Sequence, residues 1–181
     1  MRIGIDLDET ICNTSKIINE YMNQYALKEN IDVDAVMPTR RDDFFNRYTV
    51  DIFKNVEIKP HVSEVLNRLK DEGHELYAIT ARSGELTSKK IEIVEPTINW
   101  LKEHNIKIDK LITNAYHEEK AQVCLENKID LMIDDDIYNC QEIGKVGIKY
   151  LLFDDKNRYD ISNKVTNWLD IEKIIERNDI K

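Results

Sequence analysis

Two pairs of aspartates follow apolar segments of this sequence. Asp6 and Asp8 come directly after the segment RIGI, and Asp134 and Asp135 follow the segment LMI. Carboxylates that share a site repel one another, and burying an ionised acid is costly unless a cation compensates its charge. Oxygen ligands favour a hard ion such as Mg²⁺, and no Cys and His spacing typical of zinc is present. The two pairs therefore predict a Mg²⁺ site, provided that the fold brings them together.

These residue types suit the transfer of a phosphoryl group. One aspartate of the first pair can attack phosphorus and form an aspartyl-phosphate, while the other protonates the leaving oxygen and then deprotonates the attacking water. Thr80 adds a hydroxyl donor after an apolar segment, and Lys120 adds a cation in the first turn of an expected helix. The amino end of that helix also favours anions. Phosphoryl transfer needs mainly positioning and charge stabilisation, and this set offers both.

Five short strand-like segments must position these side chains, and helical patterns separate them. Strands are expected at 2–6, 75–80, 110–113, 130–134 and 149–153, and helices at 61–71, 96–105, 117–127 and 168–177. This alternation predicts an α/β fold with a doubly wound, mostly parallel sheet. Because ligands bind beyond the carboxyl ends of such strands, we expect the residues that follow each strand to meet at one edge.

The interval between the first two strands carries a separate unit. Residues 14–59 hold helical patterns such as SKIINEYMNQYAL but no convincing strand, and the interval is longer than an α/β unit needs. We expect a single domain over 1–181, in which a small helical insertion at about 14–59 sits above a core formed by 1–13 and 60–181. Within the core, Asp136 is expected to cap the helix that follows it.

The composition limits the classes of function. The chain is 41% hydrophobic and 34% charged, which is typical of a globular rather than a disordered chain. The net charge of −9 argues against binding to nucleic-acid polymers, because such binding needs Lys and Arg to neutralise phosphates. The start lacks the apolar run of a signal peptide, and no apolar run is long enough to span a membrane. The three scattered cysteines suit a reducing compartment, so we expect a cytoplasmic protein.

The ordered motifs resemble those of the haloacid dehalogenase superfamily, most of whose members are Mg²⁺-dependent phosphatases and phosphotransferases. The motifs are DLDET at 6–10, the apolar segment ending in Thr80, the helical Lys120, and the apolar segment ending in Asp134 and Asp135. They occur in the superfamily's order, each at a strand or helix end, over residues 3 to about 153. The insertion falls where the superfamily places its type-1 cap.

The resemblance implies a role for each matching residue. Asp6 corresponds to the nucleophile, and Asp8 corresponds to the general acid and base. The implied phosphate-binding group is Thr80, its neighbour Ala81, and Lys120. The implied metal ligands are Asp6, Asp8 through its backbone carbonyl, and Asp135, with Asp134 and Asn139 as close neighbours or further ligands. Which acid of the 134–135 pair touches the metal directly is left open.

Weaker features favour the deoxyribonucleotidase-like group and its bacterial relatives. They are the short helical cap, the sequence ITAR in the second motif, and an end that resembles LLF…NR…V-NW, here over 151–168. This resemblance implies a nucleoside 5′-monophosphate substrate, in particular a deoxynucleotide. The open alternatives are a phosphatase for a sugar phosphate or another small phosphomonoester, a catalytically inactive binding module, and a phospho-acceptor signalling domain, whose motif order differs.

Some residues of the insertion are candidates for contact with the substrate. Arg40, Arg41 and Phe44 lie close together in the sequence, and an aromatic ring can stack on a base. Packing of a small helical cap is the alternative explanation for the same residues.

The roles of three residues of the core are open at this point. Arg82 could reach the substrate or cover the cap boundary, and His117 precedes Lys120 and could line the site. Glu9 departs from the first motif, in which a glycine often follows the second aspartate, and its role is open.

Overall fold

The computed structural model describes residues 1–85 and 87–177, and its strands form one parallel sheet in the order β3-β2-β1-β4-β5-β6. The strands are β1 (Arg2–Ile5), β2 (Glu75–Ile79), β3 (Lys110–Ile112), β4 (Leu131–Asp134), β5 (Lys149–Phe153) and β6 (Lys164–Val165). The five expected strands are confirmed to within about two residues. The edge strand β6 was not expected, because two residues are too short to carry a pattern.

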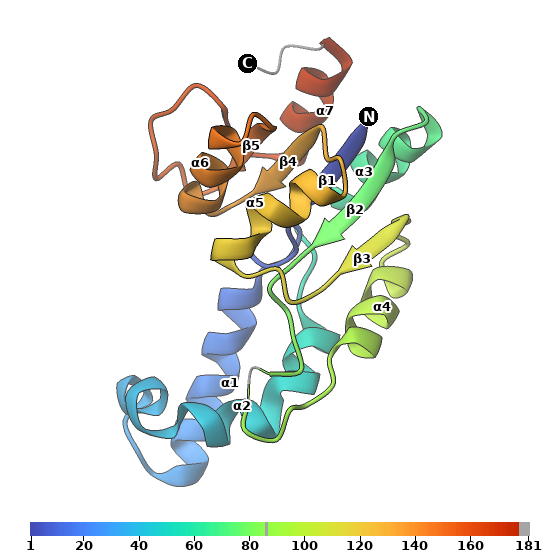
Figure 1. Cartoon of the computed structure of the whole chain (residues 1–181). Coiled ribbons are helices and arrows are strands. Elements are labelled where there is room, and N and C mark those ends of the chain that lie inside the picture. The colour runs from blue at the N-terminus through green and yellow to red at the C-terminus, as the bar shows by residue number, and fades with distance from the viewer. Residues whose placement is uncertain (86, 178–181) are drawn as a thin grey trace.

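Helices cover both faces of this sheet, as the doubly wound prediction requires (Figure 1). They are α3 (Val62–Asp71), α4 (Val94–Glu103), α5 (His117–Glu126), α6 (Ile137–Lys145) and α7 (Trp168–Arg177). Alternate residues of β4 point to opposite faces: Ile133 packs in the cluster that contains α3 and α7, and Met132 packs in the cluster that contains α5 and α6. None of the helices within the described residues is long and apolar enough to cross a membrane.

The interval between β1 and α3 is helical. It contains α1 (Thr14–Glu29), the short 3₁₀ helix η1 (Val33–Ala35) and α2 (Val36–Asn55), and these helices project beyond the carboxyl ends of the strands (Figure 1). Tyr25 packs edge-to-face against Phe44 with ring centroids 5.8 Å apart. We call α1, η1 and α2 the cap helices, and the outer bounds of the insertion stay a prediction.

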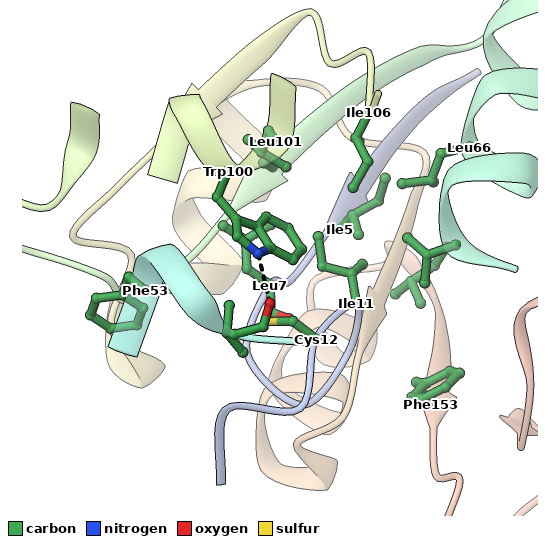
Figure 2. Close-up of a cluster of buried hydrophobic side chains, with 14 of the residues drawn as sticks. Ile5, Leu7, Ile11, Cys12, Phe53, Leu66, Trp100, Leu101, Ile106 and Phe153 are labelled. Carbon is green, nitrogen blue, oxygen red and sulfur yellow. Dashed lines mark hydrogen bonds between the residues drawn. The ribbon is translucent and has the colours of Figure 1, made fainter. Parts of the chain in front are cut away.

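Helix α4 braces the cap helices against the sheet. It packs along α2, and the Trp100 indole donates a hydrogen bond of 2.8 Å to the carbonyl of Val56, directly after α2 (Figure 2). Phe53 and Trp100 belong to the same buried cluster as β1 residues such as Ile5. The cap helices and the sheet therefore share one hydrophobic core.

The strand order reverses at β1, which creates the crevice where this fold places its sites. The chain moves from β1 to β2 on one side and reaches β4 only later, on the other side. A hydrogen bond of 2.9 Å from the Asp6 amide to the carbonyl of Ile133 holds the carboxyl ends of β1 and β4 together. Ligands bind at such switch points in doubly wound sheets.

Candidate active site

A pocket opens at this switch point, and the predicted core motif residues line it. The lining residues are Asp6, Asp8, Glu9, Thr80, Ala81, Ala115, His117, Lys120, Asp134, Asp135, Asp136 and Asn139. The fold thus brings together side chains that are separated by more than a hundred residues in the sequence. His117, which was expected only as a candidate, also faces this pocket.

The turn after β1 explains the unassigned Glu9. Its backbone adopts φ of 59°, in the left-handed region where glycine is usual. Its carboxylate accepts a hydrogen bond of 2.6 Å from the amide of Ser15, the second residue of α1, and lies 3.5 Å from the Lys156 ammonium. Asn13 offers α1 no side-chain cap, so Glu9 satisfies a helix amide that would otherwise lack an acceptor.

Lys120 joins the two acidic pairs. Its ammonium donates a hydrogen bond of 2.7 Å to Asp6 and one of 2.6 Å to Asp134. All three side chains are largely buried. Burial alone would lower the pKa of Lys120, but the adjacent carboxylates raise it above its ordinary value. Lys120 is therefore a permanent cation beside both acids.

Asn139 connects Asp134 to the mouth of the pocket. Its amide nitrogen donates to both Asp134 oxygens, at 3.2 and 3.1 Å, and its oxygen lies 2.7 Å from Nδ1 of His117. The Asp136 amide also donates a hydrogen bond of 2.9 Å to the Asp134 carboxylate. The Asp136 carboxylate caps α6, as expected. These bonds fix Asp134 in place and use both ends of the Asn139 amide.

Three carboxylates in the pocket are arranged so that they could hold a metal ion. Asp6, Asp134 and Asp135 each place an oxygen within 4.8 Å of the others. Burial raises the pKa of Asp6 well above its ordinary range, and the charges of Asp134 and Asp8 add to this shift against the opposing Lys120. Burial, followed by the charges of Asp134 and Glu9, raises the pKa of Asp135 to about 7. Three closely spaced carboxylates that face one pocket, of which Lys120 is bonded to two, fit a hard divalent ion.

Asp8 is held by a different cation, Arg82. Nε of Arg82 donates a hydrogen bond of 3.0 Å to Oδ2 of Asp8, and Nη2 donates one of 2.7 Å to Oδ1. The interaction is therefore bidentate. The Thr14 hydroxyl donates a further hydrogen bond, of 2.5 Å, to Oδ1 of Asp8. Burial would raise the pKa of the Asp8 carboxyl, but the charge and hydrogen bonds of Arg82, with help from Thr14, bring the pKa below its ordinary value.

Thr80 stands at the carboxyl end of β2 with a rigid backbone. Its amide donates a hydrogen bond of 3.0 Å to the carbonyl of Ile112, and its carbonyl accepts one of 3.0 Å from the amide of Ala115. The hydroxyl oxygen accepts a bond of 3.2 Å from the Arg82 amide, which leaves the hydroxyl proton to be donated elsewhere. Thr80 and Lys120 thus offer hydrogen-bond donors in the same pocket that Asp6 lines.

Of the four candidate substrate contacts Arg40, Arg41, Phe44 and Arg82, the structure contradicts Phe44. Phe44 is fully buried among aromatic rings of the cap helices, so packing, not base stacking, explains it. Arg41 is exposed and lies over the Phe45 ring at 5.0 Å, and Arg40 is exposed as well. Arg82 is 2% exposed. None of these four predicted residues is among the described residues that line the pocket.

Comparison of the sequence with known proteins gives a family match over almost the whole chain. The model of the family described as 5′ nucleotidase, deoxy (Pyrimidine), cytosolic type C protein matches residues 1–180. The protein YqfW of Bacillus subtilis is 28% identical over 98% of this chain and 95% of the relative. The nucleotidase CA_C3379 of Clostridium acetobutylicum is 24% identical over 98% of this chain and 94% of the relative.

Solved structures share the fold at much lower identity. A phosphatase of the haloacid dehalogenase superfamily from Thermococcus onnurineus aligns with a TM-score of 0.67 at 14% identity, covering 96% of this chain and 97% of that one. The magnesium-bound YfnB from Bacillus subtilis aligns with a TM-score of 0.70 at 10% identity, covering 97% and 98%. These likenesses support the fold.

Proposed function

Because the chain belongs to the family of cytosolic type C deoxy 5′-nucleotidases, within the haloacid dehalogenase superfamily, and is therefore a phosphomonoester hydrolase, we propose that it hydrolyses a nucleoside 5′-monophosphate in a Mg²⁺-dependent reaction. We further propose that the reaction passes through an aspartyl-phosphate on Asp6. The preferred substrate is a deoxynucleotide, as the family description suggests.

One observation carries this proposal. Lys120 holds the proposed nucleophile Asp6 and Asp134 of the second acidic pair in one buried cluster, with hydrogen bonds of 2.7 and 2.6 Å, in a pocket that Thr80 also lines. An oxygen nucleophile, a fixed cation and a hydroxyl donor around one space are the groups that phosphoryl transfer requires. A purely structural cluster would not need to leave this space open to solvent.

The proposed reaction uses Asp6 and Asp8 in turn. A carboxylate oxygen of Asp6 attacks phosphorus, and the bond between phosphorus and the alcohol oxygen breaks. Asp8, which must first take up a proton against the charge of Arg82, gives that oxygen its proton. Asp8, now ionised, then takes a proton from water, whose oxygen attacks phosphorus and releases phosphate and the Asp6 carboxylate. Lys120 and Thr80 donate hydrogen bonds to the phosphoryl oxygens and stabilise the charge that develops there.

The proposed metal ligands are Asp6, Asp135 and the backbone carbonyl of Asp8, with Asp134 and Asn139 beside them. Mg²⁺ bound there supplies positive charge that offsets the carboxylates and the phosphate. Asp134 already receives bonds from Lys120, Asn139 and the Asp136 amide. The Asp135 carboxylate, by contrast, has Arg158 at 4.0 Å as its nearest cation among the residues that the structure describes. We therefore propose Asp135 as the direct ligand of the second pair.

The remaining proposals concern the substrate and its setting. We propose that residues 14–59 act as a cap that limits the space for the part of the substrate beyond the phosphate. The substrate is a small phosphorylated metabolite, and the compartment is the cytoplasm, in line with the cytosolic description of the family.

A substrate panel tests the proposed function. Initial rates are measured with deoxyribonucleoside and ribonucleoside 5′-monophosphates, sugar phosphates and 4-nitrophenyl phosphate, in Mg²⁺ and in excess EDTA. We expect the highest kcat/KM for a deoxyribonucleoside 5′-monophosphate, loss of turnover in EDTA and recovery on addition of Mg²⁺. The Asp6→Asn variant, purified in parallel, measures contaminating phosphatases.

Two results would overturn parts of the proposal. A sugar phosphate that is hydrolysed with higher kcat/KM than every nucleotide would replace the nucleotide assignment with the sugar-phosphate alternative. Turnover that is unchanged after removal of divalent ions would remove Mg²⁺ from the reaction.

A further inference from the structure

Arg82 has no place in the reaction proposed above, yet it is the most enclosed arginine near the pocket. It follows Thr80 by two residues, in the loop after β2, and is 2% exposed. Burying a guanidinium is costly unless its donors are satisfied. Its donors reach Asp8, the Thr97 hydroxyl of α4 at 3.3 Å, and the Cys12 sulfur at 3.3 Å.

The bond to Asp8 determines how that carboxylate points. Arg82 forms a fork on both Asp8 oxygens, at 2.7 and 3.0 Å, and Thr14 adds a third donor. A planar guanidinium fixes the plane of a carboxylate, which a single ammonium cannot do. Arg82 therefore sets the orientation of the residue proposed to move protons to and from the substrate.

The start of α1 and the end of α2 contact the pair formed by Arg82 and Asp8. Thr14, which bonds to Asp8, is the first residue of α1. Phe53 lies near the last turn of α2, and the Arg82 guanidinium carbon lies 4.4 Å from the centre of its ring. A cation over an aromatic face is attracted by the ring, more strongly where water is excluded. The side of Arg82 that faces the cap helices is thus held by Phe53.

We propose that Arg82 is a positioning residue that links the seating of the cap helices to the orientation of Asp8. Phe53 holds the guanidinium plane, and that plane holds the Asp8 carboxylate. This inference rests on the proposed role of Asp8 as general acid and base. Of the two roles expected for Arg82, it favours a place at the cap boundary over contact with the substrate. Arg82 is not among the described residues that line the pocket, and its charge is already matched by Asp8.

Three variants and two substrates test the proposal. Arg82→Lys keeps the charge but removes the fork, and Phe53→Leu removes the ring but keeps an apolar side chain. Phe45→Leu is the matched control, because Phe45 is also in α2 and also lies under an arginine, Arg41, at 5.0 Å. It stands about 12 Å along the helix from Phe53. The substrates are phenyl phosphate and 4-nitrophenyl phosphate, so the test does not depend on the nucleotide assignment.

We expect Arg82→Lys to lower kcat on phenyl phosphate by about 10²-fold, with KM within about threefold, because misplacing a catalytic group affects the transition state more than binding. The loss should be smaller on 4-nitrophenyl phosphate, whose leaving group needs less help from a general acid. Phe53→Leu should lower kcat in the same pattern, and Phe45→Leu should leave kcat at the wild-type value. The double variant Arg82→Lys/Phe53→Leu should match Arg82→Lys within about twofold, since both act through one contact.

Several outcomes would overturn the proposal. Equal losses on the two aryl phosphates, a raised KM with unchanged kcat, or multiplicative losses in the double variant would each contradict it. If Arg82→Lys does not fold, as judged by circular dichroism, Phe53→Leu against Phe45→Leu decides the question alone. A wild-type protein that hydrolyses neither substrate would instead contradict the proposed function.

Discussion

Glu9 is a residue on which two local requirements act in opposite directions. A side chain at φ of 59° costs about 1–2 kcal/mol relative to the right-handed region, which favours glycine. The same side chain accepts the Ser15 amide at the start of α1, a type of contact that contributes about 1 kcal/mol to helix stability. The carboxylate therefore offsets the strain of its own backbone.

Replacing Glu9 by glycine and by alanine separates these effects. Glu9→Ala loses the cap and keeps the strain, so we expect the free energy of unfolding to fall by about 1 kcal/mol. Glu9→Gly loses the cap but relieves the strain, so its free energy of unfolding should lie near the wild-type value. Urea unfolding measures both variants, and a glycine variant less stable than the alanine variant would contradict this account of Glu9.

Asp135 is expected to bind a divalent ion that stabilises the folded protein. Its carboxylate lies in the cluster with Asp6 and Asp134, where a divalent ion would relieve their repulsion. We expect Mg²⁺ at 100 times its Kd to stabilise the wild type by about 2.7 kcal/mol, measured by urea unfolding. Asp135→Asn should lose most of this stabilisation, and Asp136→Asn, which removes a neighbouring charge but keeps a residue that caps α6, should keep it. Equal Mg²⁺ stabilisation of Asp135→Asn and the wild type would exclude Asp135 as a ligand.

Among the elements, α4 connects the sheet to the cap helices, and its last turn contains a pH-sensitive contact. His104 follows α4, and its ring lies 4.5 Å from that of Trp100, whose indole donates to the carbonyl of Val56. Burial lowers the pKa of His104 below its ordinary value, against the opposing charge of Glu103. The folded protein therefore favours the neutral ring.

The sign of the resulting pH dependence follows from proton binding. Between the lowered folded pKa and the unfolded value near 6.5, the unfolded chain binds more protons at His104, so stability rises with pH. The contribution is complete above about pH 6.5 and is lost as the pH falls through this window. We expect the stability of the wild type relative to His104→Gln to decrease between about pH 7.5 and 5.5. A difference that stays constant over this range in urea unfolding would contradict the prediction.

The elements were predictable from the sequence where hydrophobic periodicity was strong. The α3 pattern of Val62, Val65, Leu66 and Leu69 marks one helix face, and all four are buried. Strand β6 was not predictable, because Lys164 and Val165 carry no repeat. Helix α4 begins at Val94, two residues before Pro96, since proline is tolerated anywhere in the first helical turn.

At the scale of the whole molecule, the sequence predicted which residues meet but not how their side chains pair. Asp6, Thr80 and Lys120 could be placed because each stands at the end of a strand or in the first turn of a helix, and the parallel sheet brings those ends together. The bond between Arg82 and Asp8 depends on side-chain direction and on Phe53 of α2. No spacing rule contains that information.

The role of the aromatic residues in the cap helices also depends on packing that the sequence does not show. The sequence indicated a helical insertion, and its aromatic and basic residues suited either a base or a core. Burial decides between these, because Phe44 has no exposed surface while the pocket lies against the sheet. The contribution of the cap helices to the site is instead indirect, through Thr14 and Phe53.

The turnover of Asp6→Asn with Mg²⁺ and 4-nitrophenyl phosphate shows whether Asp6 is the nucleophile. Asparagine keeps the shape of the side chain but removes the nucleophilic carboxylate, so we expect kcat to fall by more than about 10³-fold while circular dichroism and urea unfolding still report a folded protein. Asp43→Asn, a change of the same kind in α2 beside Tyr25, should leave kcat at the wild-type value. An Asp6→Asn protein with the wild-type kcat would contradict the proposed mechanism.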